Sequence, residues 1–316
     1  MKTKKLIYLA LFLLLTTSCS STNAFKRSNS YTPKSHQKVI KQIQKLFYNF
    51  HGKAGLYVHN LATGETFAIN ADSLYPTASM IKVPIMVTLF NEMNEGKYTY
   101  NQQFVYDGKH DYPYDKDIIN SEKIGTKVPL SQLIMLMISM SNNSAALWCQ
   151  SIAGGGLAIN HWLSTHGYKV LRMNSRTPGR EQAYKKYGWG VTSPRELAEL
   201  VTQIFKGKVV SKAASEEMYR TMSRSFWDGE AMSQIPYWVN VASKQGAVDQ
   251  ARSEVDFVNA PHGNYIFCIA TKDQQDTSWT YNNAGYVLIR NVSKVLWQHF
   301  EPQSKYKFNP GRKKYW

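Results

Sequence analysis

The sequence predicts an α+β fold, an α/β sandwich in which one antiparallel sheet is built from both ends of the chain and a second lobe is all helical. Three observations predict it: strand patterns lie near both ends of the globular region, apolar helical patterns fill its middle, and turn residues separate the last strands. With 316 residues, 43% of them hydrophobic, the chain is long enough for a large core and too apolar to be disordered.

The amino-terminal part of the globular region predicts a helix, a hairpin and a second helix. Apolar residues recur at helical spacing between residues 36 and 50. Residues 54–60 and 65–70 then flank the turn sequence Leu61-Ala-Thr-Gly64, as the strands of a hairpin do. Residues 79–94 predict an apolar helix.

The rest of the chain predicts a helical middle and a final meander. Residues 129–141 are dominated by Leu, Ile and Met, so we expect this helix to be buried on all sides. Ser193 and Glu196 form a capping box that opens a helix reaching about residue 205. Three strands and a closing helix are expected at 241–247, 251–258, 265–271 and 284–300. A cleft between the sheet and the helical lobe is the expected place for chemistry.

The first residues predict an export signal. Three lysines within the first five residues precede a ten-residue apolar run that is too short to span a membrane. Thr16-Thr-Ser-Cys19 resembles the bacterial lipoprotein cleavage site, although leucine is usual where Thr16 stands. We expect residues 1–18 to be removed, Cys19 to carry a lipid anchor in the membrane, and residues 19–35 to form a tether. Ordinary cleavage near Ala24 is the alternative, and either way the protein is expected in the bacterial cell envelope.

The charge balance bears on the partners of the chain. Lys and Arg number 38 against 22 Asp and Glu, a net charge of +16 that falls to +13 when the three lysines of residues 1–18 are removed. A basic exported protein suits anionic envelope polymers or lipid head groups, or is simply a soluble basic protein. The basic residues are spread without a nucleic-acid-binding motif, and the tail at 303–316 is short, so we expect no nucleic-acid partner and a monomer.

Cysteine and histidine positions argue against disulfides and metals. If Cys19 is acylated, Cys149 and Cys268 remain, each within an apolar pattern, which predicts buried free thiols. No metal and no cofactor are expected, because the following histidines lack metal-ligand spacing: His59, His161, His166 and His262.

Three short motifs have residues suited to catalysis. The first, Ser79-Met-Ile-Lys82, places a hydroxyl and an amine on one face of a helix start. A desolvated, neutral lysine there could accept the serine proton and create an attacking alkoxide. Alone the pattern is weak, because this spacing arises roughly once by chance in a chain of this length.

The second and third motifs lie far downstream. Ser141 and Asn143 follow the apolar helix and could relay a proton and hold a substrate amide, although Ser and Asn also cap helix ends. Lys244 lies on a predicted strand, where a lysine serves an anion or a proton relay or marks an edge strand. Gly246 would permit close approach of another backbone or a ligand.

Taken in order, these motifs resemble the S-x-x-K, S-D-N and K-T-G signature of the serine penicillin-recognising enzymes, and most of all the class A β-lactamase family. The resemblance runs from about residue 36 to residue 300. It includes the Pro178-Gly179 and Thr192-Ser-Pro194 sequences that frame the omega loop of that family. It implies a β-lactamase/transpeptidase-like serine hydrolase domain over residues 36–302.

The resemblance implies a role for each matching residue. Ser79 would be the acylated nucleophile and Lys82 its proton acceptor. Ser141 would pass a proton to the leaving nitrogen, and Asn143 would bind the substrate amide. Lys244 would hold the substrate carboxylate and tune the relay.

The remaining pocket residues match less closely. The backbone N–H of Ala247 would complete an oxyanion hole with that of the nucleophile. Gln245 replaces the usual Thr or Ser and should crowd or reshape the carboxylate pocket. Arg252 lies within one residue of the family's carboxylate-binding arginine, on a strand where one residue decides the face. Tyr112 and Tyr114 are candidates for the aromatic lining of the cleft mouth.

Two departures concern the second motif and the omega loop. Asn142 replaces an aspartate that is mostly structural in the family. The family's omega-loop glutamate, which activates the deacylating water, is missing: Val170 stands at its place, eight residues before the Pro-Gly pair, and no acid occurs between Glu122 and Glu181. Asn174 does match the loop's asparagine. Glu181 is a possible substitute base, the alternative being a solvent-exposed charge.

Three functions follow from the resemblance and its departures. The first is a hydrolase that forms an ester at Ser79 with β-lactams or related cell-wall amides and releases it slowly. The second is an envelope D-alanyl-D-alanine carboxypeptidase or penicillin-binding protein acting on peptidoglycan peptides, which the missing glutamate favours because penicillin-binding proteins deacylate without it. The third is a catalytically silent binding lipoprotein, against which the intact motif residues argue.

Overall fold

The computed structural model describes residues 33–309, so the predicted export signal, Cys19 and most of the predicted tether lie outside the described residues. Within these residues there are two 3-10 helices, Ala78–Ile81 (η1) and Ala231–Gln234 (η2). The α-helices are α1 (Pro33–Tyr48), α2 (Lys82–Asn94), α3 (Leu130–Ser139), α4 (Asn143–Ile152), α5 (Gly155–Thr165), α6 (Glu181–Tyr187), α7 (Pro194–Phe205), α8 (Lys212–Met222) and α9 (Ala284–Phe300). The strands are β1 (Lys53–Asn60), β2 (Thr66–Ile69), β3 (Tyr75–Pro76), β4 (Gln103–Val105), β5 (Lys127–Pro129), β6 (Arg172–Met173), β7 (Gly190–Thr192), β8 (Val241–Val248), β9 (Ala251–Val258) and β10 (Tyr265–Lys272).

One antiparallel sheet of five strands joins both ends of the described chain, in the order β2-β1-β10-β9-β8. The register of β1 with β10 begins at Lys53 opposite Lys272. β8 pairs only with β9 in this sheet, with Lys244 opposite Val255, so β8 is an edge strand. The sheet, its hairpin and its meander confirm the α+β class predicted from the sequence.

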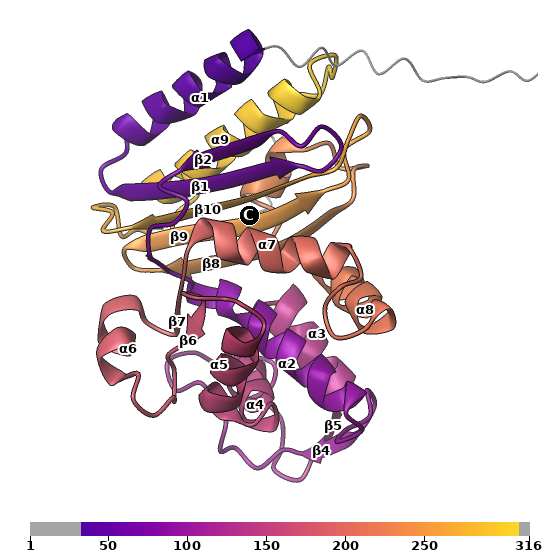
Figure 1. Ribbon diagram of the computed structural model, residues 1–316. Coiled ribbons are helices and arrows are strands. Elements are labelled where there is room, and N and C mark those ends of the chain that lie inside the picture. The colour runs from indigo at the N-terminus through magenta and orange to yellow at the C-terminus, as the bar shows by residue number, and fades with distance from the viewer. Residues whose placement is uncertain (1–32, 310–316) are drawn as a thin grey trace, which may run out of the picture. The chain divides into compact units, whose positions relative to one another are not determined.

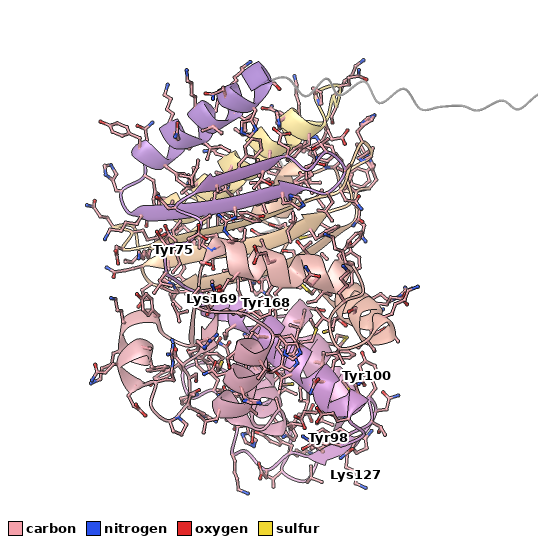
Figure 2. All side chains as sticks on the ribbon, viewed as in Figure 1. Tyr75, Tyr98, Tyr100, Lys127, Tyr168 and Lys169 are labelled. Atoms are coloured by element: carbon pink, nitrogen blue, oxygen red, sulfur yellow. The ribbon has the colours of Figure 1, made fainter. Side chains whose placement is uncertain are left out.

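Helices cover the two faces of the sheet (Figure 1). On one face, α1 and α9 pack together through apolar side chains such as Ile43 and Leu296. On the other face, α7 lies between the sheet and the helical lobe, and its Leu197 shares a core with Phe257 of β9. Figure 2 shows Tyr75 and Tyr168 near this boundary between sheet and lobe.

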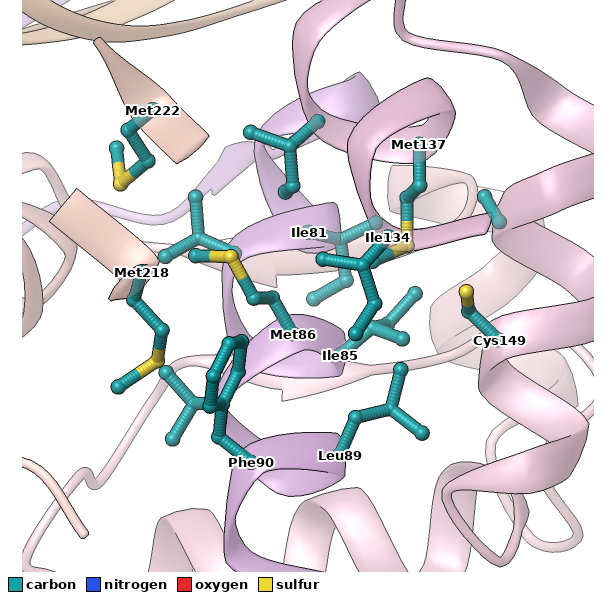
Figure 3. Close-up of a cluster of buried hydrophobic side chains, with 14 of the residues drawn as sticks. Ile81, Ile85, Met86, Leu89, Phe90, Ile134, Met137, Cys149, Met218 and Met222 are labelled. Atoms are coloured by element: carbon teal, nitrogen blue, oxygen red, sulfur yellow. The ribbon is translucent and has the colours of Figure 1, made fainter. Parts of the chain in front are cut away.

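The helical lobe is organised around α2, which is buried from its first residue, Lys82, to Phe90. Figure 3 shows apolar side chains of α2 surrounded by others from α3, α4 and α8, among them Ile134, Cys149 and Met218. The prediction that 129–141 is buried on all sides is wrong along one edge of α3, where Met135 is 41% exposed. The reason is that α3 lies at the outside of the lobe and presents a strip to solvent.

Several details differ from the sequence prediction. α1 begins at Pro33, three residues earlier than expected. The Ser193 hydroxyl caps α7 by accepting the Glu196 N–H, but the Glu196 carboxylate does not return the bond; it accepts the backbone N–H groups of residues 169–171 instead. The prediction of buried free thiols is confirmed for Cys149 and Cys268. Within residues 33–309, no helix is long and apolar enough to cross a membrane.

Candidate active site

The predicted nucleophile lies in a short turn between the sheet and the helical lobe. Ser79 is in η1, and α2 begins three residues later at Lys82. Ala78 adopts a left-handed conformation, with φ of 43°, which is unfavourable for a residue with a Cβ. A hydrogen bond to β7 also holds this turn in place: the Thr77 N–H donates to the carbonyl of Gly190 at 3.0 Å. Ser79 is partly exposed.

Gly246 explains how closely the edge strand approaches this turn. A Cβ at this position would lie 2.5 Å from the Thr77 carbonyl oxygen and 2.9 Å from the Ser79 nitrogen. Only glycine leaves room for that contact, as predicted from its place in the strand. The contact brings the Gly246–Ala247 backbone beside Ser79, where the sequence predicted an oxyanion hole made by the N–H groups of Ser79 and Ala247.

Lys82 is fully buried and surrounded by oxygen acceptors. Its Nζ donates to the Ser141 carbonyl oxygen at 2.6 Å, the Ser141 Oγ at 3.2 Å and the Asn143 Oδ1 at 2.8 Å. Burial lowers the pKa of Lys82 well below its usual 10.5, nearby Lys244 lowers it further, and Asp117 opposes both effects. Burial thus favours the neutral form of this amine, which can accept a proton as a general base requires.

Ser141 connects the two buried lysines. Its Oγ accepts a hydrogen bond from Lys244 Nζ at 3.0 Å as well as the bond from Lys82 Nζ. Ser141 adopts a left-handed conformation, with φ of 58°, which is unusual for a non-glycine residue. Burial lowers the pKa of Lys244 to about 7. A hydroxyl held between two amines of lowered pKa is suited to passing a proton between them and a substrate.

Asn142 takes the structural place of the family's aspartate, and a carboxylate comes from elsewhere in the chain. The Asn142 side chain caps α4 by accepting the Ala145 N–H at 2.7 Å. Asp117, from the loop before β5, accepts the Ser144 N–H at 2.9 Å beside this cap. Burial alone would raise the pKa of Asp117, but hydrogen bonds from Asn120, Ser144 and Asn142 hold it below its usual value. Sequence reasoning missed Asp117 because it lies outside every motif.

The omega loop presents an aromatic ring to Lys82. The Trp189 ring centroid lies 5.7 Å from Lys82 Nζ, within the range of a cation–π contact. Asn174 is buried in the loop, where its Oδ1 accepts bonds from Arg180 Nε at 3.0 Å and Nη2 at 2.8 Å. Its Nδ2 donates to the Gly188 carbonyl at 3.1 Å. The asparagine that matched the family pattern therefore holds the loop together through Arg180.

The position of Glu181 argues against its role as a substitute base. It is exposed at the start of α6, and its Oε1 accepts the Gly179 N–H at 3.0 Å. Backbone hydrogen bonds lower the pKa of Glu181. An efficient base needs a raised pKa near the operating pH, which burial would supply and solvent does not. The structure thus agrees with the alternative of a solvent-exposed charge, and the role of Glu181 as a substitute base stays a prediction.

Arg252 is wrongly assigned to the substrate pocket. It is fully buried and paired with Ala247 in the register, so it lies on the sheet face opposite to Lys244. Its guanidinium donates to the carbonyls of Val248, Ala251 and Ser278, and it stacks on rings near the start of α9, those of Trp279 and Tyr286. The one-residue offset from the family position placed this side chain on the far face.

Aromatic side chains lie on both sides of the Ser141 loop. The Tyr112 N–H donates to the Ser144 hydroxyl at 2.9 Å, and its ring lies 5.9 Å from that of Trp189. Tyr114 is 84% exposed beside Tyr112, at a ring distance of 5.4 Å. Trp227, which no motif indicated, donates from its Nε1 to the carbonyl of the residue before Ser141 at 2.9 Å. Aromatic residues are therefore bonded directly to the backbone and side chains of residues 140–144.

Comparisons with known proteins agree with this geometry. The model of the Beta-lactamase enzyme family matches residues 38–300. The chain is 20% identical to the β-lactamase VEB-1 of Pseudomonas aeruginosa, over 85% of this chain and 93% of that protein. It is 23% identical to the β-lactamase SME-1 of Serratia marcescens, over 72% and 76% of the two chains.

Solved structures share the fold. The structure of PBP-A superimposes with a TM-score of 0.73 at 26% identity, covering 84% of this chain and 96% of that one. A mutant of PBP-A has been solved as an acyl-enzyme complex with penicillin G. The TLA-1 extended-spectrum β-lactamase shares the fold with a TM-score of 0.76 at 15% identity, covering 84% and 99%.

Proposed function

Because the chain belongs to the class A β-lactamase family and is a β-lactamase-like serine hydrolase, we propose that it forms an acyl-enzyme at Ser79 with β-lactams or related cell-wall amides and releases it slowly. One observation carries the proposal: the Ser141 hydroxyl accepts hydrogen bonds from both buried lysines, Lys82 and Lys244. A proton relay needs such a connection between a base and a leaving group.

The proposed acylation uses these residues in sequence. Lys82 takes the proton of the Ser79 hydroxyl, and the Ser79 oxygen forms a bond to the substrate carbonyl carbon. The N–H groups of Ser79 and Ala247 stabilise the negative charge that develops on the carbonyl oxygen. The carbon–nitrogen bond then breaks, Ser141 gives its proton to the leaving nitrogen, and the ammonium of Lys82 returns a proton to Ser141. Asn143, which is bonded to Lys82, is placed to hold the substrate amide.

Slow release follows from the omega loop. Hydrolysis of the ester at Ser79 requires a base that activates water. The loop brings Trp189 to Lys82, while its own acid, Glu181, is exposed. The Oδ1 of Asn174 is already occupied by Arg180. These contacts support efficient acylation with inefficient deacylation.

A second candidate is a D-alanyl-D-alanine carboxypeptidase or penicillin-binding protein that acts on peptidoglycan peptides. It is favoured by the 26% identity to PBP-A and by the omega loop without a positioned carboxylate. For either candidate we propose a location in the bacterial envelope with a lipid anchor at Cys19, on the basis of the signal pattern in the first nineteen residues.

The test is to incubate the protein with penicillin G or a chromogenic cephalosporin and to follow intact mass and product together. A persistent adduct with little product, absent from the Ser79→Gly variant, is the expected result. Rapid turnover without an adduct would contradict slow release. Neither adduct nor product would contradict the hydrolase and favour a silent binding lipoprotein.

A further inference from the structure

The side chain of Gln245 covers the lysine that the family uses for the substrate carboxylate. Lys244 Nζ donates to the Gln245 Oε1 at 2.5 Å, the Gln245 carbonyl oxygen at 3.0 Å and the Ser141 Oγ at 3.0 Å. An ammonium group has three N–H donors. In its ammonium form, Lys244 therefore has an acceptor within the protein for each of its donors, and two of these acceptors belong to the next residue in the chain.

The place of this lysine on the edge strand makes the arrangement possible. Consecutive residues of a strand point to opposite faces, so the side chain of Gln245 would usually point away from that of Lys244. β8 is the edge of its sheet, and no further strand of the sheet covers its outer side. The long side chain of Gln245 bends around this edge to reach Nζ, which a Thr or Ser at the same position is too short to do as an acceptor.

The other cations near the site offer little to an anion. The Nζ of Lys82 is bonded to three oxygens of Ser141 and Asn143. The guanidinium of Arg252 is bonded to carbonyl oxygens on the opposite face of the sheet. A substrate carboxylate that approached Lys244 would have to displace the amide oxygen of Gln245.

We propose that Gln245 weakens the binding of a free carboxylate beside the scissile amide, so that this site reacts with acyl donors whose carboxylate is masked as a neutral ester or carboxamide at least as readily as with the free acids. The inference rests on the proposed function, since it specifies the substrate class of the same site. A neutral substrate leaves the bond between Gln245 and Lys244 intact. The amide nitrogen of Gln245 has two N–H donors, which can bond the carbonyl oxygen of an ester or carboxamide.

The test compares penicillin G with its methyl ester, which differ only in the carboxylate. Rates of Ser79 acylation are measured by intact mass for the wild type and for the variants Gln245→Thr, Gln245→Ala and Gln245→Glu. In the wild type, the ester is expected to react at least as fast as the acid. Gln245→Thr and Gln245→Ala free one donor of Lys244 and should raise the rate for the acid, relative to the ester, by about tenfold or more, because a bond to a charged group is among the stronger hydrogen bonds.

Gln245→Glu is the matched control, because it keeps the shape of the side chain and adds a fixed carboxylate. It should lower the rate of acylation by penicillin G further, while the methyl ester still acylates Ser79. A wild type that prefers the acid by more than tenfold, with a ratio that none of the variants changes, would overturn the inference and leave the proposed function standing. Failure of both probes to form an adduct in the wild type and in every variant would overturn the proposed function and the inference together. Thermal melting of each variant checks that it folds.

Discussion

Replacing Gly246 by alanine tests whether the contact between β8 and the nucleophile turn supports catalysis. The added methyl carbon would lie 2.5 Å from the Thr77 carbonyl oxygen, whereas ordinary contact begins at 3.4 Å, so the strand and the turn must separate by about 0.9 Å. The obstructing atoms at Thr77 and Ser79 belong to the backbone and cannot rotate away. Overpacking of this kind lowers the free energy of unfolding by about 1–3 kcal/mol. For a domain of this size we expect a drop of roughly 2–12 °C in Tm.

The acylation rate of the Gly246→Ala variant should fall further than its reduced folding stability alone would explain. Moving β8 from η1 pulls the N–H of Ala247 away from that of Ser79, and loss of one oxyanion donor lowers rates by about 10²–10³. The assay is the rate of adduct formation with penicillin G, alongside a thermal melt.

Gly285→Ala provides the control, because a Cβ there would lie at similarly short distances, 2.5 Å from Gln274 Oε1 and 2.7 Å from Arg252 Cγ, but against side-chain atoms and on the far side of the sheet. It should lose stability and keep its acylation rate. A folded Gly246→Ala variant that acylates at the wild-type rate would refute the reasoning, as would an equal loss in Gly285→Ala.

Three further variants test other parts of the site and the core. Asp117→Asn removes the carboxylate that raises the pKa of Lys82, so the rising limb of the acylation pH profile should move to lower pH; an unchanged profile would contradict this electrostatic link. Glu181→Gln should leave the rate of product release within about twofold in a time course of adduct decay, because Glu181 is exposed and of lowered pKa; a large slowing would restore it as the base. Burial raises the pKa of Asp256 and of the neighbouring Glu254 above their usual values. The stabilisation from the protonated pair is therefore fully present below about pH 4 and is lost as the pH rises, so Tm should fall from pH 4 toward neutral pH, and less so in Asp256→Asn; parallel melting curves of the two proteins would contradict the titration of Asp256.

The strand and helix pattern allowed much of the fold to be predicted. The meander and α9 were placed within a residue or so, because alternating or continuous apolar runs are bounded there by turn residues. The short pairings of β3 with β7 and of β6 with β7 were not predicted, since two- or three-residue strands have too few side chains for a period. α6 was missed for a similar reason: in the structure, none of its residues is buried, so it has no apolar face to detect.

The motif residues of the site were predictable from their order and spacing, but their surroundings were not. Ser141 meets both Lys82 and Lys244 as the motifs implied. Asp117 and Trp227 reach the site from loops, where no periodicity marks a residue as facing the cleft. Arg252 was a candidate for the site because it lies within one residue of the family's arginine. Side chains alternate between the two faces of a strand, however, and this offset places Arg252 on the face opposite to Lys244.

The two buried amines also set a limit on how stable this protein is. Lys82 and Lys244 are both fully buried, and burial disfavours the charged form of each. An apolar side chain of similar length, such as methionine, would fill the same space without that penalty. In a chain without acyl-transfer activity, substitutions that replace both lysines by apolar residues would therefore raise thermal stability. Under the proposed function, the two lysines together lower the resistance to unfolding in exchange for a reactive site.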